Sequence, residues 1–265
     1  MYRVFFSLVL YKQSLEELEI LIENISSFER LASKNNIEVR LLILDNSPIK
    51  LNHYFNDFGF IKYIFNNKNI GFGRGHNQNL LNINFRTTDI YLIINPDITF
   101  KADELVKYVD NFSISNYVCM APLIKNPGRK IQYTVKKDPT VLSLFLSRFK
   151  FLTKITIFKN YYNQHINYNF DYLNDKINSS YLSGCFLLVK AKTFNKVKGF
   201  DPDYFLHLED ADFSRKCSIE GEVIHNPECT VFHKWARGSH KSLRQMYFLI
   251  KSMFTYFNKW GFKIF

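Results

Sequence analysis

The chain has 265 residues, 46% of them hydrophobic, and its 35 Lys and Arg against 24 Asp and Glu give a formal net charge of +11. This composition fits one large α/β domain with a substantial core, and the charge favours an anionic partner such as nucleic acid, acidic lipid or a diphosphate compound. The four cysteines form no CxxC pair, which argues against a zinc or redox centre, and no uncharged run reaches the roughly 18 to 20 residues of a membrane-spanning helix.

The first third of the chain alternates apolar runs typical of strands with segments of helical spacing. Strands are predicted at 4–10, 37–45, 60–66 and 89–95, and helices at 14–31, after the capping residue Ser14, and at 75–85. Strands that alternate with helices predict a mostly parallel sheet, whose ligand crevice lies at the carboxyl ends of the strands.

The rest of the chain begins with a segment of unclear periodicity. Residues 126–177, rich in Asn and Tyr, predict a variable insertion or a mobile segment that covers the substrate on the acceptor side. Further elements are predicted as a buried strand at 180–190, helices at 191–197 and 209–219, and short strands at 222–226 and 229–233.

The last 25 residues predict a helix rich in aromatic and basic side chains. Such a helix lies on an anionic membrane surface or packs against the main domain, and the sequence leaves both open. We therefore expect a domain at 1–240 and an amphipathic C-terminal helix at 241–265.

Polar side chains follow several of the predicted strands. Tyr11 follows the first strand, Asp45 ends the second, and Asn-Pro-Asp at 95–97 follows the fourth. Each acid alone is as typical of a turn as of a site. Because parallel strands project their ends into one crevice, Asp45 and Asp97 are more informative as a pair.

A glycine-rich stretch, GFGRG at 71–75, partly matches the dinucleotide-binding fingerprint. Position 76 is His and the stretch follows a third strand rather than the first, so an oxidoreductase is disfavoured. The glycines allow close backbone approach, and Arg74 could contact a phosphate, although a plain loop is the alternative.

Three acids lie within the apolar, aromatic stretch YFLHLEDADFSRK at 204–216. On a helix, Glu209 and Asp212 share a face, whereas Asp210 points elsewhere. Acids at a helix start also suit its dipole, so capping is an alternative to catalysis. His233, after the last predicted strand, is open to a structural or a ligand role.

The motifs that follow one another along the chain are VLYKQS, LILDNS, NKNIGFGRGHN, YLIINPD, YLSGCFLLVK, GFDPDYFLHLEDADFSRK and VFHKWARGS. In this order they resemble the bacterial inverting glycosyltransferases of GT-A fold, family 2, in the rhamnosyltransferase-like branch. The resemblance runs from residue 4 to about residue 239, and the segment with the three acids is its most specific part. It implies a Rossmann-like, mixed but mostly parallel sheet flanked by helices.

The resemblance also implies roles for individual residues. It makes Asp210 the catalytic base beside Glu209, and it assigns a divalent cation, Mg²⁺ or Mn²⁺, to the motif at 95–97. The implied nucleotide-sugar and metal contacts are Tyr11 and Asp45 at the base, Asn69, Arg74 and Asn95 on the diphosphate side, and Asp97 and His233 at the metal.

The chemistry of inverting transfer is consistent with this set. One base takes the proton of the acceptor hydroxyl as its oxygen attacks the anomeric carbon, and the diphosphate leaving group needs charge neutralisation rather than a proton. Asn95 stands where many GT-A enzymes have an acid. The single carboxylate of Asp97 therefore predicts a weakly held cation completed by diphosphate, water or His233.

The resemblance favours dTDP-rhamnose as the donor, with a UDP-hexose and glucosyl or galactosyl transfer as the alternative. It implies a polyprenyl-diphosphate-linked oligosaccharide of O-antigen or capsule synthesis as the acceptor, and a cytoplasmic protein that is peripheral on the inner membrane. A nucleic-acid-binding protein is disfavoured because the basic residues are dispersed and the acids gather at strand ends. An inactive nucleotide-sugar-binding relative stays open.

Overall fold

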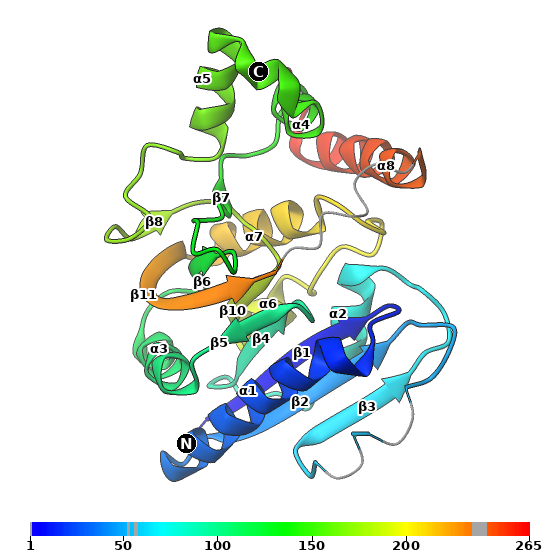
Figure 1. Cartoon of the computed structure of the whole chain (residues 1–265), viewed down its shortest axis with the longest axis vertical. Coiled ribbons are helices and arrows are strands. Elements are labelled where there is room, and N and C mark those ends of the chain that lie inside the picture. The colour runs from blue at the N-terminus through cyan, green and yellow to red at the C-terminus, as the bar shows by residue number, and fades with distance from the viewer. Residues whose placement is uncertain (1, 52–53, 56–57, 235–242) are drawn as a thin grey trace.

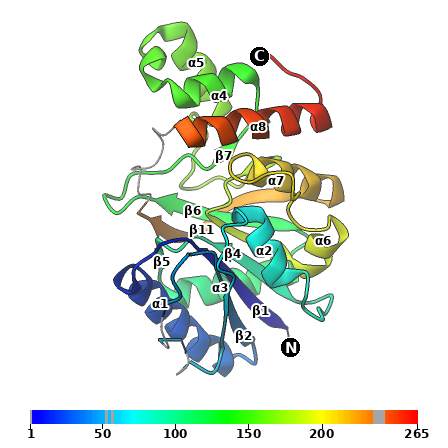
Figure 2. The same ribbon diagram turned by 90° about the vertical axis from the view of Figure 1, so that its right-hand side faces the viewer.

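The structure is a computed structural model that describes residues 2–51, 54–55, 58–234 and 243–265. A mixed sheet is covered by helices on both faces (Figures 1 and 2). The strands of this sheet are β1 (Arg3–Leu10), β2 (Glu38–Asp45), β3 (Ile61–Phe65), β4 (Ile90–Ile94), β5 (Ile98–Phe100), β6 (Cys119–Lys125), β8 (Ile177–Asn178), β10 (Phe186–Lys190) and β11 (Val223–His233). Their order is β3-β2-β1-β4-β10-β6-β11-β5, with β8 paired to β11.

A second, two-stranded sheet pairs β7 (Val135–Lys136) with β9 (Tyr181–Leu182). The helices are α1 (Leu15–Lys34), α2 (Phe72–Leu80), α3 (Ala102–Ile114), α4 (Val141–Arg148), the 3₁₀ helix η1 (Lys150–Lys154), α5 (Thr156–His165), α6 (Ala191–Lys196), α7 (Glu209–Glu220) and α8 (Leu243–Trp260).

The β3-β2-β1-β4 half of the sheet is parallel throughout, as the alternation of strands and helices predicted. Ser14 caps α1 in a reciprocal capping box with Glu17, so this local signal is confirmed. Leu10 lies opposite Asp45, and Leu8 opposite Ile94. The ends of β1, β2 and β4 therefore meet at one edge, which we call the carboxyl edge.

Side chains that alternate along the strands fill two apolar layers. Phe6 and Leu8 of β1 pack in the layer beneath α1 and α3. Phe5 packs on the opposite face, in the layer that includes Phe194 of α6 and Phe213 of α7. The sheet is thus buried on both faces, and its carboxyl edge is held between two rigid layers.

Three of the predicted elements have different bounds in the structure. The strand predicted at 180–190 is wrong as one element, because β9 pairs with β7 and the chain then bends at 183–185 before β10 joins the main sheet. The short strands predicted at 222–226 and 229–233 form the single strand β11. Its register shifts between His225 and Thr230, where Pro227 has no amide hydrogen to donate.

The helix predicted at 75–85 begins and ends earlier, as α2. Gly71 precedes its first residue with φ of 91°, a conformation that favours glycine. A Cβ on Gly73 would lie 2.8 Å from the Phe200 side chain, and one on Gly75 would lie 2.7 Å from Val9. The glycines that suggested a loop therefore allow a helix to pack very close to its neighbours.

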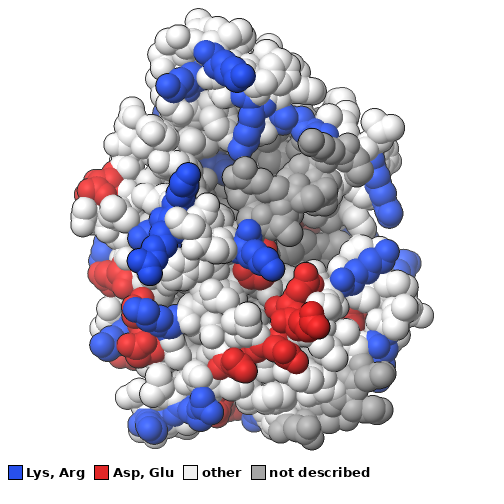
Figure 3. Space-filling view, in the orientation of Figure 1, with Lys and Arg blue, Asp and Glu red and all other residues white. Residues whose placement is uncertain are grey.

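The segment 126–177 is more regular than its sequence suggested, since it includes α4, η1 and α5. Thr140 begins α4 with a capping box to Ser143. Figure 3 shows Lys and Arg over the end of the molecule that carries α4 and α5, whereas most Asp and Glu on this face lie further down.

One side of the helix α8 packs beside α4 and α7, so the expected packing against the main domain is confirmed for that side. Leu144, Leu208, Tyr256 and Phe257 belong to one buried cluster. The predicted boundary at 240–241 and part of the VFHKWARGS motif lie outside the described residues. Among the described helices, none has the length and apolar content to cross a membrane.

Candidate active site

The turn at 183–185 lies at the centre of the carboxyl edge. The amide of Asn95 donates to the carbonyl oxygen of Cys185 at 2.9 Å, and the amide of Gly184 donates to Oδ2 of Asp210 at 3.0 Å. A Cβ on Gly184 would lie 3.1 Å from that of Asp210 and 3.3 Å from the ring of Phe72. Glycine at 184 thus lets the carboxylate approach the backbone, a role that sequence analysis missed.

Asp97 and His233 meet on the other side of this turn. Antiparallel pairing of β5 and β11 sets His233 opposite Ile98, and Nε2 of His233 lies 3.2 Å from Oδ1 of Asp97. The side-chain amide of Asn95 lies 3.4 Å from the same ring nitrogen. Two residues of the predicted metal motif are therefore in contact with the predicted histidine.

Gln132 holds His233 from behind. Its Nε2 donates to the carbonyl oxygen of His233 at 2.7 Å, and its Oε1 lies 3.0 Å from Nδ1 of the ring. Because an amide oxygen only accepts, Nδ1 is the protonated nitrogen that donates to it. Burial opposes the charged ring, but hydrogen bonds to Asp97 and Cys185 outweigh burial and raise the pKa of His233 to about 10.

These residues fit a divalent cation only in part. Among the described residues, no group of three or more His, Cys, Asp and Glu side chains is arranged to hold a metal. Asp97 supplies one donor, His233 supplies a second once Nε2 loses its proton, and the amide oxygen of Asn95 could supply a third after a side-chain flip. Mg²⁺ and Mn²⁺ need more oxygen ligands than this, so the set suits a cation that a diphosphate completes.

Glu209 and Asp210 begin α7 directly after two residues with left-handed backbone. His207 has φ of 74° and Leu208 has φ of 64°, and non-glycine residues in this region carry strain that is often found at functional sites. Among the described residues, no side chain makes an N-cap hydrogen bond at Leu208. Asp210 accepts from the amide of Ala211 at 2.9 Å, so this acid satisfies a backbone donor in the first turn of the helix.

Glu209 is a buried carboxyl group, and among the described residues its Oε2 has no hydrogen-bond partner. Burial raises the pKa of Glu209 to about 8, and the charge of Asp210 adds to the shift. Glu209 is therefore largely neutral at pH 7.

Asp212, the third acid, has a structural role. Its buried Oδ1 accepts from Nε1 of Trp260 at 2.8 Å and lies 2.8 Å from Nζ of Lys259. Lys259 also bonds Oδ2 of Asp201 at 2.7 Å. This contact, which we call the α7–α8 clasp, fastens α8 to α7.

The glycine-rich motif joins α2 to the segment that leads into the acids. Asn77 makes two hydrogen bonds with the backbone of Phe200, at 2.7 and 2.8 Å. Nε of Arg74 donates to the carbonyl oxygen of Pro202 at 2.6 Å. A Cβ on Gly71 would lie 2.4 Å from the carbonyl oxygen of Phe205. The diphosphate contact expected of Arg74 stays a prediction.

The residues expected at the nucleotide base lie further along the carboxyl edge. Asp45 is fully buried, and it accepts from the amide of Ser47 at 2.9 Å and from the hydroxyl of Tyr63 at 2.6 Å. Tyr11 is exposed. Asn69 accepts from the amide of Gly71 at 3.0 Å. Tyr11 is thus accessible at the surface, whereas Asp45 is enclosed and bonded to Ser47 and Tyr63.

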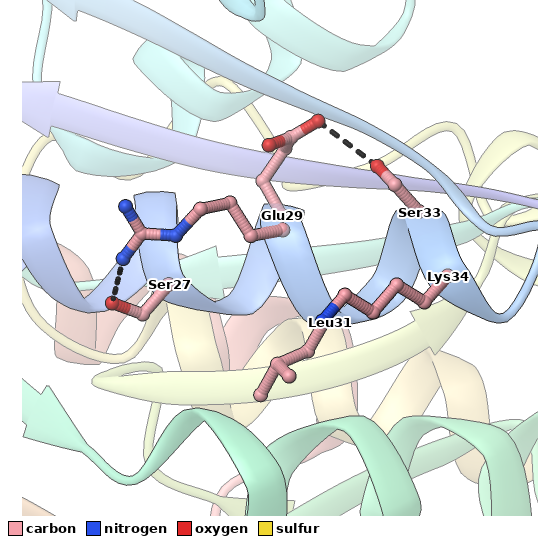
Figure 4. A pocket seen from close by; sticks show the side chains of 6 residues that line it. Ser27, Glu29, Leu31, Ser33 and Lys34 are labelled. Carbon is pink, nitrogen blue, oxygen red and sulfur yellow. Dashed lines mark hydrogen bonds between the residues drawn. The ribbon is translucent and has the colours of Figure 1, made fainter.

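Two pockets of the structure lie away from these residues. One, of about 600 Å³, lies along the second half of α1 (Figure 4), where Arg30 bonds Ser27 and Ser33 bonds Glu29. Another, of about 540 Å³, includes Tyr2 at the start of β1. Both lie at the opposite edge of the parallel strands, so we assign them no part in the candidate site.

No family model matches the chain. Among curated proteins, rhamnosyltransferase WbbL of Escherichia coli strain K12 is 27% identical over 162 residues, which are 58% of this chain and 57% of that protein. The chain therefore spans little more than half the length of this relative.

Solved glycosyltransferase structures share the fold. GalNAc-T7 with UDP, GalNAc and Mn²⁺ aligns with a TM-score of 0.60 at 14% identity, over 87% of this chain and 42% of that one. The mannosyltransferase PcManGT of Pyrobaculum calidifontis, with GDP-Man and Mn²⁺, has a TM-score of 0.58 at 12% identity, over 89% and 58%. TarS of S. aureus, residues 1–349, has a TM-score of 0.53 at 13% identity, over 87% and 60%. The GT-A fold expected from the sequence motifs is confirmed, together with a sequence likeness to a rhamnosyltransferase.

Proposed function

We propose that this GT-A-fold chain is an inverting glycosyltransferase of bacterial O-antigen or capsule synthesis. It moves a sugar, with rhamnose favoured, from a nucleoside diphosphate to a hydroxyl of a lipid-linked oligosaccharide. One observation carries the proposal: the turn at 183–185 holds Asp210 on one side and Asn95, next to Asp97 and His233, on the other. Asp210, which would face the acceptor, and the polar cluster that would face the leaving group thus lie on either side of one turn.

Asp210 acts as the base in this reaction. It takes the proton of the acceptor hydroxyl while that oxygen forms a bond to the anomeric carbon and the bond from this carbon to the diphosphate oxygen breaks. A largely neutral Glu209 avoids a second negative charge beside Asp210. The left-handed residues before α7 fix where the carboxylate lies.

The leaving diphosphate departs with its negative charge. Asp97 and His233, with Asn95, would hold Mg²⁺ or Mn²⁺, which supplies charge neutralisation when bound. Gln132 keeps Nε2 of His233 directed toward this cluster. Mn²⁺ in the structures of GalNAc-T7 and PcManGT supports a divalent cation as the cofactor.

The donor is a nucleotide sugar. UDP with GalNAc and GDP-Man in the neighbouring structures support this class, and the likeness to a rhamnosyltransferase supports dTDP-rhamnose, with a UDP-hexose as the alternative. We assign Tyr11 and Asp45 to the base, and Asn69, Arg74 and Asn95 to the diphosphate side. A polyprenyl-diphosphate-linked acceptor would place the protein on the cytoplasmic face of the inner membrane.

Thermal unfolding with dTDP-rhamnose, UDP-glucose and GDP-mannose, each with and without Mn²⁺, tests the donor class, because a ligand of the native state raises the midpoint. Stabilisation by one nucleotide sugar that increases with Mn²⁺ is expected. No shift with any of them, together with a salt-sensitive shift by oligonucleotides, would favour nucleic-acid binding instead.

Asp210→Asn tests the base. Transfer should fall about 100-fold or more, because the amide cannot take the proton, while the donor-induced rise of the midpoint persists. Asp203→Asn is the matched control at an exposed position of the same segment. Near-normal transfer by Asp210→Asn would reject this role.

A further inference from the structure

Two segments carry positive charge without any acid. Residues 141–165 and 243–265 contain no Asp or Glu, and their basic residues are Arg148, Lys150, Lys154, Lys159, Arg244, Lys251, Lys259 and Lys263. Lys259 belongs to the α7–α8 clasp. We call the two segments together the basic end.

Both segments lie at one end of the molecule, although about 80 residues separate them in sequence (Figures 1 and 2). The amides of Val141 and Leu142 donate to the carbonyl oxygens of Lys263 and Ile264, at 3.0 and 3.1 Å. Leu144 of α4 shares a buried cluster with Tyr256 and Phe257 of α8. The basic end is therefore one packed unit.

An apolar stripe runs along the exposed side of α8. The stripe consists of Leu243, Tyr247, Ile250 and Phe254, whose side chains are 46% to 89% exposed. Intervals of four, three and four residues set them on one face of the helix. The opposite side, with Ser252 and Tyr256, is buried. Arg244 and Lys251, seven residues apart, lie along one border of the stripe.

The other segment of the basic end has the same composition. Phe145, Phe151, Ile155 and Ile157 are 48% to 71% exposed. Figure 3 shows Lys and Arg over this end. Large apolar side chains and basic residues thus share both parts of the exposed surface.

This chemistry selects one partner. A second copy of the chain would bring two acid-free basic surfaces together, and like charges repel. A nucleic acid would engage the basic residues but leave the aliphatic Leu243 and Ile250 in water. An anionic membrane satisfies both, because its headgroups attract Lys and Arg while the apolar side chains enter the boundary with the acyl chains.

We propose that the basic end is a docking surface for anionic lipid membranes. The α7–α8 clasp then connects the docked helix to α7, whose first residues include Asp210. This inference rests on the proposed function in one respect: a lipid-linked acceptor gives the protein a reason to dock on a membrane.

The test uses the full chain, without nucleotide sugar, in co-sedimentation with phosphatidylcholine vesicles that contain or lack phosphatidylglycerol. Binding should require the anionic lipid and weaken as salt rises. Tyr247→Ser combined with Phe254→Ser should weaken binding about tenfold or more. Arg244→Glu combined with Lys251→Glu should weaken it roughly 25-fold or more, at about fivefold for each basic residue.

Matched controls lie elsewhere on the surface. Ile114→Ser combined with Ile219→Ser removes apolar side chains of similar exposure, and Lys107→Glu reverses an exposed charge. All variants change exposed residues, so their midpoints should stay near that of the parent chain. If a variant of α8 does not fold, Phe151→Ser with Ile157→Ser supplies the same comparison on the other segment.

Two results would overturn the inference. One is vesicle binding that the apolar variants leave unchanged, or that the control pair weakens as much. The other is tighter binding to an oligonucleotide that depends on the basic residues alone. Neither depends on the donor, so the thermal-shift panel with nucleotide sugars reports separately on the proposed function.

Discussion

Replacing Glu209 by Gln should stabilise the protein at neutral and mildly alkaline pH. Burial raises the pKa of this carboxyl group from 4.5 to about 8. Below pH 4.5 the group is neutral in both the folded and the unfolded chain. As the pH rises toward 8, Glu209 ionises in the unfolded chain but stays protonated in the folded one. The free energy of unfolding therefore falls.

The size of the effect follows from the difference between the two pKa values. One pKa unit corresponds to about 1.4 kcal/mol, so the shift of Glu209 sets an upper bound of about 5 kcal/mol at pH 8. Gln has nearly the same shape and no charge, and it avoids this loss. A gain of about 2 kcal/mol already raises the midpoint of a protein of this size by roughly 4 to 8 °C.

Thermal unfolding of both proteins across this pH range measures the effect. The difference between Glu209→Gln and the parent should be small below pH 4.5, grow up to about pH 8 and then level off. Glu222→Gln makes the same chemical change at an exposed position and is the control. A difference that stays constant over the whole range would refute the reasoning, because only a buried, protonated carboxyl group produces the slope.

Two further predictions concern residues that support the site. Gln132→Leu should weaken the Mn²⁺-dependent part of donor binding about tenfold or more, because the His233 ring loses its partner at Nδ1. Calorimetry with Mn²⁺ measures this, and unchanged Mn²⁺ affinity would speak against it. Gly71→Ala should lower the free energy of unfolding by about 2 kcal/mol or more, since the φ of Gly71 is 91° and a Cβ would lie 2.4 Å from the carbonyl oxygen of Phe205. Denaturant unfolding measures this. Gly59→Ala is the control and should cost far less, because a Cβ there would have no atom within 4 Å.

Local signals predicted the parallel half of the fold well. The capping box of Ser14 with Glu17 and the apolar runs of β1, β2 and β4 depend on residues close in sequence. Parallel pairing then required Asp45 and Asp97 to lie at the same edge. Helical spacing also predicted that Glu209 and Asp210 point in different directions. In the structure Glu209 is buried, whereas Asp210 accepts from the amide of Gly184.

Long-range contacts were not readable in the same way. Gln132 lies in a segment without clear period, 101 residues before the histidine that it holds. Gly184 contacts Asp210 because the chain turns there from the two-stranded sheet into the main sheet. No local sequence pattern indicates that turn. Helical spacing put Glu209 and Asp212 on the same face, and only the position of α8 shows that Asp212 has contacts with Trp260 and Lys259 that Glu209 lacks.

The α7–α8 clasp joins residues that lie far apart in the order of synthesis, since Asp212 and Trp260 are separated by 48 positions. Synthesis runs from the first residue to the last, so α7 leaves the ribosome well before Lys259 and Trp260. Until they arrive, Asp212 has the ammonium group of Lys216, 3.8 Å away on the same helix, but lacks its contacts with Trp260 and Lys259. The apolar contacts of α7 with the main sheet do not involve α8, whereas the contacts of Asp212 with Trp260 and Lys259 form only when α8 packs on α7. Separation of α8 from α7 would therefore leave Asp212 with one cationic partner instead of two.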